Sequence, residues 1–287
     1  MIGIFGAIGW HALAKVDSGT MDMVINGAGY DVALAFSSLQ VPTSFASSVS
    51  DGKTAELMKM DLEEHGLTDL LLREPGLPFT GSVAWYERGE ERLMRAHPAF
   101  DLNYPISFLE NIVKKNDTLI VELGFKETTL QTLVMFADMY EKKILWIVRD
   151  ENAWKKLQHN PAWQKFSVFV GPHAYDKLPD YIRYLDTLKK TGFAAITKNA
   201  NMLLIWHNES HQMLRVSEST LHPEYRFSNI VAALVNEMTS WGLSLVDAAQ
   251  SCAGAFESWV DLQDTGGADL ERKVATFYKK VENLEHD

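Results

Sequence analysis

The segment HPEYRFSNIVAALVNEM, residues 222–238, carries the residue types best suited to chemistry in this chain. A helix is predicted at 228–241, so Arg226 stands at its N-terminus, where a guanidinium can hold an anion. Asn229 can accept a hydrogen bond and orient a hydroxyl group, but its amide has no useful basicity. The structural alternatives are a surface salt bridge for Arg226 and an ordinary helix amide for Asn229.

A second set of polar residues lies near the start of the chain. His11 follows Trp10, and its imidazole can either bind a polar ligand or pack with the indole in a pocket wall or core. Asp31 follows the glycine turn at 26–29, where its carboxylate favours a helix start through the dipole. Contact with a ligand is an equal alternative for Asp31.

Two histidines in HNESH, His207 and His211, have a spacing that suggests a metal site. A zinc site needs three or four converging ligands, and no partner cluster is visible in the sequence. A hairpin connection explains the string better, so no metal is expected there. The single cysteine, Cys252, lies in a predicted helix and is expected to pack as a small hydrophobe.

Strands and helices alternate along the chain, which is typical of a mostly parallel sheet. Strands are predicted at 2–5, 43–49, 118–122, 143–148, 167–170, 194–197 and 202–206. Helices are predicted at 32–39, 53–65, 128–141, 180–190, 228–241, 245–259 and 269–284. Two further strand segments, 21–25 and 81–94, are predicted to form a small flap beside the sheet. Ligands bind beyond the carboxyl ends of such strands, so the site is expected between these ends and the flap.

Composition excludes several classes of protein. With 287 residues, 46% of them hydrophobic, and a net charge of -11, the chain is predicted to be globular and to bind no nucleic acid. No apolar stretch is long enough to span a bilayer, and the start lacks the basic region of an export signal. A lone cysteine fits a cytoplasmic location. Because no linker interrupts the sequence, residues 1–287 are predicted to form a single domain.

Two stretches resemble the ribokinase-like (PfkB) family of sugar and nucleoside kinases. NGAGYDVALAFSSLQVPTSFASSVSDGKTAELMKMDLEEHGLTDLLL follows the family's N-terminal pattern, with Gly27 in the glycine turn and Asp31 at the polar helix start. PFTGSVAWYERGEERL is similar to the next segment, in which a Thr-Gly leads into lid strands. The resemblance implies a three-layer α/β/α fold with a central mostly parallel sheet and a small β-strand lid from about 12–26 and 80–97. It also implies a homodimer formed through the lid strands.

The resemblance places the catalytic centre at the late helix start. The family has a Gly-Ala-Gly-Asp motif there, whose glycine N–H groups hold phosphate and whose Asp removes a proton. In this chain Arg226, Phe227 and Ser228 occupy the anion-hole position, and Asn229 occupies the position of the base. His11 stands where the family has an Asp that binds sugar hydroxyls. The expected catalytic Asp is therefore replaced.

The nucleotide and metal positions are altered too. The family's Asn-x-x-Glu stretch, associated with magnesium and phosphate, corresponds to VGPHAYDKL, which supplies Gly171 and Ala174. Its Thr-x-Gly-x-x-Gly loop corresponds to Thr197, Asn199 and Met202, so two glycines that contact the nucleotide are missing.

Three functions follow as hypotheses. The preferred one is a catalytically impaired kinase homologue, a pseudokinase, that binds a sugar, a nucleoside-like ligand or a protein partner. The second is a divergent active phosphotransferase in which Arg226 holds the anion and Glu224 replaces the base. The third is a dimeric scaffold subunit. ATP and Mg²⁺ are expected as cofactors only if the protein is active, and whether it is an enzyme stays open at this point.

Overall fold

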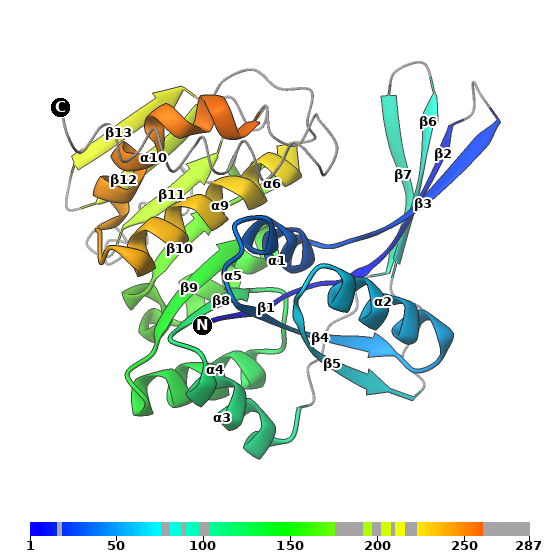
Figure 1. Ribbon diagram of the computed structural model, residues 1–287, viewed down its shortest axis with the longest axis horizontal. Helices are drawn as coiled ribbons and strands as arrows, with labels where there is room; N and C mark the ends of the chain where they lie inside the picture. The colour runs from blue at the N-terminus through cyan, green and yellow to red at the C-terminus, as the bar shows by residue number, and fades with distance from the viewer. Residues whose placement is uncertain are drawn as a thin grey trace. The chain divides into compact units, whose positions relative to one another are not determined.

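The computed structural model describes residues 1–15, 19–75, 81–87, 90–97, 104–175, 192–196, 202–207, 210–215 and 223–260 (Figure 1). The chain divides into two compact units. Unit 1 comprises Met1–Ser37 and Pro42–Lys142, and unit 2 comprises Ser38–Val41 and Lys143–Asp287. The helices predicted at 180–190 and 269–284 lie outside the described residues. Whether residues 1–287 act as a single domain stays a prediction.

The body of unit 1 is a parallel sheet in the order β8-β1-β4-β5. Its strands are β1 (Ile2–Phe5), β4 (Thr43–Ser50), β5 (Thr68–Glu74) and β8 (Thr118–Glu122). Its helices are α1 (Ala28–Ser38), α2 (Lys53–Glu64), α3 (Ile106–Lys115) and α4 (Glu127–Met139). Strands β1 and β8 are buried over their whole length. This matches the unbroken apolar runs expected of strands that are covered on both faces.

Helices cover both faces of this sheet, as two neighbours in β4 demonstrate. Ser44 donates a hydrogen bond of 3.2 Å to Asn116, which follows α3. Phe45 packs edge-on against Tyr30 of α1, with 6.3 Å between ring centroids. Successive residues of a strand point to opposite faces, so α1 and the end of α3 lie on opposite sides of β4.

Unit 1 also contains a second sheet of four strands in the order β3-β2-β6-β7 (Figure 1). Its strands are β2 (Gly9–Lys15), β3 (Thr20–Asn26), β6 (Gly81–Glu87) and β7 (Glu90–His97). Strand β2 pairs antiparallel with β3 and parallel with β6, and β6 pairs antiparallel with β7. We call this sheet the lid. It uses the two chain segments, near 12–26 and 80–97, from which a lid was predicted.

Unit 2 contains strands in the order β9-β10-β11-β12-β13, of which the first three run parallel. The last two are antiparallel. The strands are β9 (Lys143–Val148), β10 (Ser167–Val170), β11 (Phe193–Ile196), β12 (Met202–His207) and β13 (Ser210–Arg215). The helices are α5 (Glu151–His159), the 3₁₀ helix η1 (Pro161–Lys165), α6 (Pro172–Tyr175), α9 (Pro223–Ser240) and α10 (Leu245–Val260).

Tryptophans fill the core of unit 2. Trp146 and Trp154 are fully buried, and the ring of Trp146 lies 5.6 Å from that of Trp163. Both buried indoles keep their hydrogen bonds, since Trp146 donates to the carbonyl of Trp163 and Trp154 to that of Ala174. Asp150 caps α5 by accepting a hydrogen bond of 2.9 Å from the N–H of Ala153. Within the described ranges, no helix is both long and apolar enough to cross a membrane.

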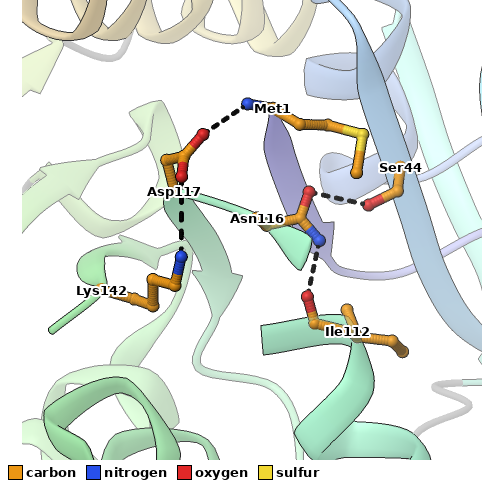
Figure 2. A network of polar contacts seen from close by, with 6 residues as sticks. All are labelled: Met1, Ser44, Ile112, Asn116, Asp117 and Lys142. Atoms are coloured by element: carbon orange, nitrogen blue, oxygen red, sulfur yellow. Dashed lines mark hydrogen bonds and ion pairs between the residues drawn. The ribbon is translucent and has the colours of Figure 1, made fainter. Parts of the chain in front are cut away.

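Polar contacts anchor the amino ends of the unit 1 strands (Figure 2). Asn116 is fully buried, and its side chain accepts from Ser44 and donates 2.8 Å to the carbonyl of Ile112. Asp117 pairs with the Met1 ammonium at 2.8 Å and with Lys142 at 3.5 Å. These contacts lie at the amino ends of the strands. A ligand is expected at the opposite end of the sheet, where the carboxyl ends of the strands lie.

Candidate functional site

Two backbone segments cross at the carboxyl end of β1. The first, Gly6 to Ile8, leads from β1 to the lid, and the second, Gly27 to Gly29, leads from the lid to α1. A Cβ atom on Gly6 would lie 2.4 Å from the Cα of Gly29. A Cβ atom on Gly27 would lie 2.2 Å from the carbonyl oxygen of Ala7, and its φ of 155° also disfavours a side chain. Glycines therefore permit this close crossing.

The turn at Gly27 also starts helix α1. The N–H of Asp31 donates 2.7 Å to the carbonyl of Gly27, and the N–H of Tyr30 donates 3.2 Å to the carbonyl of Ala7. Asp31 is 8% exposed in the first turn of the helix, where the dipole favours its carboxylate. The structure thus brings two predicted site residues, Gly27 and Asp31, to one corner of unit 1.

A second buried carboxylate lies at this corner. Glu122 is the last residue of β8, is 7% exposed, and accepts a hydrogen bond of 2.8 Å from the N–H of Ala7. Its Oε2 atom is 3.2 Å from the position that a Cβ on Gly6 would take. Sequence analysis did not single out Glu122. The available signal was an acidic residue that ends an otherwise apolar strand.

His11 lies on lid strand β2, next to Trp10 but on the opposite face, because neighbours in a strand alternate. Both residues are partly buried. The register places Trp10 opposite Ile25, and Ala12 opposite Met23, on one face of the lid. The indole N–H of Trp10 is buried and has no acceptor among the described residues. Whether His11 and Trp10 line a pocket wall or core, one of the alternatives above, stays a prediction.

In unit 2, the described part of α9 starts at Pro223, five residues before the predicted start. Proline at the first helical position is common, because its missing N–H needs no partner there. The N–H groups from Phe227 onward are thus placed for hydrogen bonds within the helix. Arg226, Phe227, Ser228 and Asn229 are all at most 3% exposed. The side chain of Arg226 is therefore not at the surface, and burial lowers the pKa of its guanidinium.

Two residues of the stretch VGPHAYDKL, Gly171 and Ala174, are buried in unit 2. Gly171 donates its N–H to the carbonyl of Val148 at 2.9 Å, and Ala174 is fully buried. The ring of Phe227 packs here, with its Cε1 atom 3.6 Å from the position of a Cβ on Gly171. No side-chain oxygen is supplied by Gly171, Ala174 or Phe227, so these positions do not fit a hydrated Mg²⁺ ion.

The remaining predicted site residues are not brought together by the described structure. Thr197 and Asn199 lie outside the described residues. His207 and His211 belong to the antiparallel strands β12 and β13. Among the residues that are described, no group of three or more His, Cys, Asp and Glu could hold a metal ion.

No protein-family model matches the sequence, and no curated protein matches it. Solved structures do. Arabidopsis thaliana ribokinase in complex with ribose and ATP is similar over 96% of this chain and 97% of its own, with a TM-score of 0.74 and 11% identity. The chain has the ribokinase-like fold. Cryptococcus neoformans ribokinase in complex with ADP matches with a TM-score of 0.67 and 14% identity, over 97% of this chain and 99% of its own. Sinorhizobium meliloti adenosine kinase matches with a TM-score of 0.64 and 13% identity, over 88% of this chain and 93% of its own.

The predicted ribokinase-like α/β fold, with its mostly parallel sheet and lid, is confirmed by this similarity over nearly the whole chain. At identities of 11 to 14%, the similarity concerns the fold. The roles assigned to individual residues remain predictions.

Proposed function

We propose that this protein binds a sugar or a nucleoside-like ligand at the glycine crossing of unit 1 and has little or no kinase activity. The observation that carries the proposal is the packing of Phe227 against Gly171. The buried ring stands at the predicted phosphate-binding position, and neither Gly171 nor Ala174 can hold a metal ion. Asn229 at the position of the base adds to this, since losing a general base typically lowers a rate by about 10²- to 10⁴-fold.

Ligand binding is supported by the glycine backbone and the buried carboxylates of unit 1. Gly27 brings backbone close to the carboxyl ends of the strands, and Asp31 and Glu122 supply buried carboxylates nearby. Carboxylates accept hydrogen bonds from hydroxyl groups. The similar structures include a ribokinase with bound ribose and an adenosine kinase, so a ligand rich in hydroxyl groups is the natural candidate.

A thermal-shift screen tests the proposal. D-ribose, D-fructose, adenosine and guanosine should be tested singly, with and without ATP and MgCl₂. A ligand at 100 times its Kd stabilises the folded state by about 2.7 kcal/mol, which raises the melting temperature by several degrees. The shift should disappear in Asp31→Asn and persist in Glu64→Gln, a matched change at an exposed acidic residue of α2. No shift with any ligand in the wild type would refute the ligand-binding part.

A phosphotransfer assay with the same ligands tests the second part. We expect turnover at least about 10²-fold below the roughly 1–100 s⁻¹ typical of kinases. Ordinary turnover that is lost in Asn229→Ala would refute catalytic impairment.

The runner-up, a divergent active kinase that uses ATP and Mg²⁺, is favoured by one observation, the buried guanidinium of Arg226 in the first turns of α9. Turnover that is lost in both Arg226→Ala and Glu224→Ala would support it. Turnover that neither change affects would count against it.

A second role, a homodimer through the lid, is supported by an exposed apolar face. Met21 and Met23 are 64% and 52% exposed, and they share a face of the lid with Trp10, Ala12 and Ile25. Light scattering at micromolar concentration should give the mass of a dimer, and Met21→Lys with Met23→Lys should give that of a monomer. A wild-type monomer would remove this role.

A cytoplasmic location stays a prediction that rests on the single cysteine.

A further inference from the structure

Glu122 makes a contact that the proposed ligand site does not use. Its carboxylate ends β8 and accepts a hydrogen bond of 2.8 Å from the N–H of Ala7, a residue 115 positions earlier in the chain. Both groups are buried. A hydrogen bond to an ionised acceptor is roughly twice as strong as one between neutral groups. The carboxylate therefore holds the Ala7 peptide firmly against the end of β8.

Ala7 is also held from its other side. Its carbonyl accepts a hydrogen bond of 3.2 Å from the N–H of Tyr30 in α1, and Gly27 packs directly against that carbonyl. Ala7 lies between β1 and lid strand β2, and Gly27 lies between lid strand β3 and α1. The two described connections between the body of unit 1 and the lid thus meet at one peptide, which Glu122 fixes.

We propose that Glu122 is a positioning residue that sets how the lid is attached to the body of unit 1. By fixing the Ala7 peptide it holds the start of β2, and through Gly27 the end of β3. Its effect on a ligand rests on the proposed function, because the lid must then stand in the right place above Asp31. Its effect on the lid itself does not depend on any ligand.

Hydrogen exchange on the full-length chain tests this role through peptides that cover β2 and β3. We expect Glu122→Ala to speed exchange in these lid peptides roughly tenfold, the factor expected when a buried N–H loses its acceptor. Peptides from β4 and β8 should change much less. Glu122→Gln keeps an amide oxygen that can accept from Ala7, so it should restore most of the protection.

The matched control is Glu237→Ala in α9, which likewise removes a buried carboxylate that accepts a hydrogen bond. Its donor is the hydroxyl of Ser251, at 3.0 Å. It should lower global stability without selective exchange in the lid. Equal acceleration in lid and body peptides of Glu122→Ala, or no acceleration, would overturn the positioning role. If Glu122→Ala does not fold, Glu122→Gln is tested in its place. We then expect a two- to threefold increase in the exchange rate that is confined to the lid peptides. An exchange rate that does not rise selectively in the lid would overturn the positioning role.

Ligand measurements on the same variants separate the two proposals. If D-ribose and adenosine fail to stabilise the wild type while lid exchange still responds to Glu122→Ala, the proposed function fails and the positioning role stands. If either ligand stabilises the wild type but lid exchange is unchanged in Glu122→Ala, the positioning role fails and the proposed function stands.

Discussion

The predicted site residues of unit 1 and those of unit 2 have different surroundings. In unit 1, backbone segments cross at Gly6 and Gly27, and a buried carboxylate, Glu122, accepts a backbone hydrogen bond. In unit 2, the ring of Phe227 packs on Gly171. Unit 1 has buried polar groups at these positions, whereas in unit 2 Phe227 and Gly171 are part of an apolar core. The comparison teaches that residues predicted to form a site can have surroundings suited to binding in one unit and to packing in another.

The largest expected effect is the loss of the Phe227 ring. Phe227 is 2% exposed, so Phe227→Ala should lower the free energy of unfolding by about 3–5 kcal/mol, the usual cost of the cavity and the lost burial. Urea denaturation measures it. A loss below about 1 kcal/mol would mean that the ring is not part of the packed core of unit 2, and the contrast between the two units would fail.

Two glycine substitutions compare the two units directly. Gly27→Ala places a Cβ 2.2 Å from the carbonyl oxygen of Ala7 at a φ of 155°, and it should cost about 2–3 kcal/mol of stability. Gly171→Ala places a Cβ 3.6 Å from the Phe227 ring, an ordinary contact, and should change stability by less than about 1 kcal/mol. Equal losses in urea denaturation would contradict the claim that the unit 1 crossing requires glycine and that position 171 does not.

A smaller effect is expected where the chain returns from the lid. The hydroxyl of Tyr104 donates to the carbonyls of Ser47 and Leu70, and burial raises the pKa of this phenol. Tyr104→Phe should therefore cost about 1 kcal/mol, the typical net value of a lost hydrogen bond. Since the phenol stays protonated, the loss should be the same at pH 6 and pH 9. A loss that changes between these pH values would show that another group is responsible.

The smallest effect is expected for the exposed ion pairs of Asp117 at the amino ends of the strands. The pKa of Asp117 is lowered, chiefly by the hydrogen bond from the Met1 ammonium. A carboxyl group with a depressed folded-state pKa stabilises the fold above its unfolded pKa of roughly 3.9, and this stability is lost as the pH falls through the lower folded value. Asp117→Asn should cost at most about 0.5 kcal/mol at pH 7, less in high salt, and nothing near pH 2. Thermal unfolding across this pH range measures the difference.

Much of the fold was predictable because its inner strands are short apolar runs. The predictions at 2–5, 118–122, 143–148 and 167–170 agree with β1, β8, β9 and β10 at both ends. Strand β5 was not predicted, because it lies at the sheet edge and is only half-buried, so its sequence TDLLLRE lacks both a continuous run and an alternation. Helices α3 and α5 were missed as well. They are only 10 and 9 residues long, and α5 consists largely of polar residues.

The candidate site was predictable only where local chemistry marks it. Gly27 and Asp31 follow from a turn and a helix start within a few residues of each other. Glu122 could not be found in this way, because its significance lies in a hydrogen bond to Ala7 across 115 positions. The described part of α9 starts earlier than predicted, because the prediction did not use Pro223 as a signal of a helix start.

The crossing at Gly6, Gly27 and Gly29 has a consequence for sequence divergence. Its geometry is set by main-chain atoms, which every residue carries, and it excludes side chains at only a few positions. The surrounding residues are then free to change as long as they fill the same volume. A crossing of this kind helps explain how the chain can have a ribokinase-like fold at 11% identity to the Arabidopsis thaliana ribokinase.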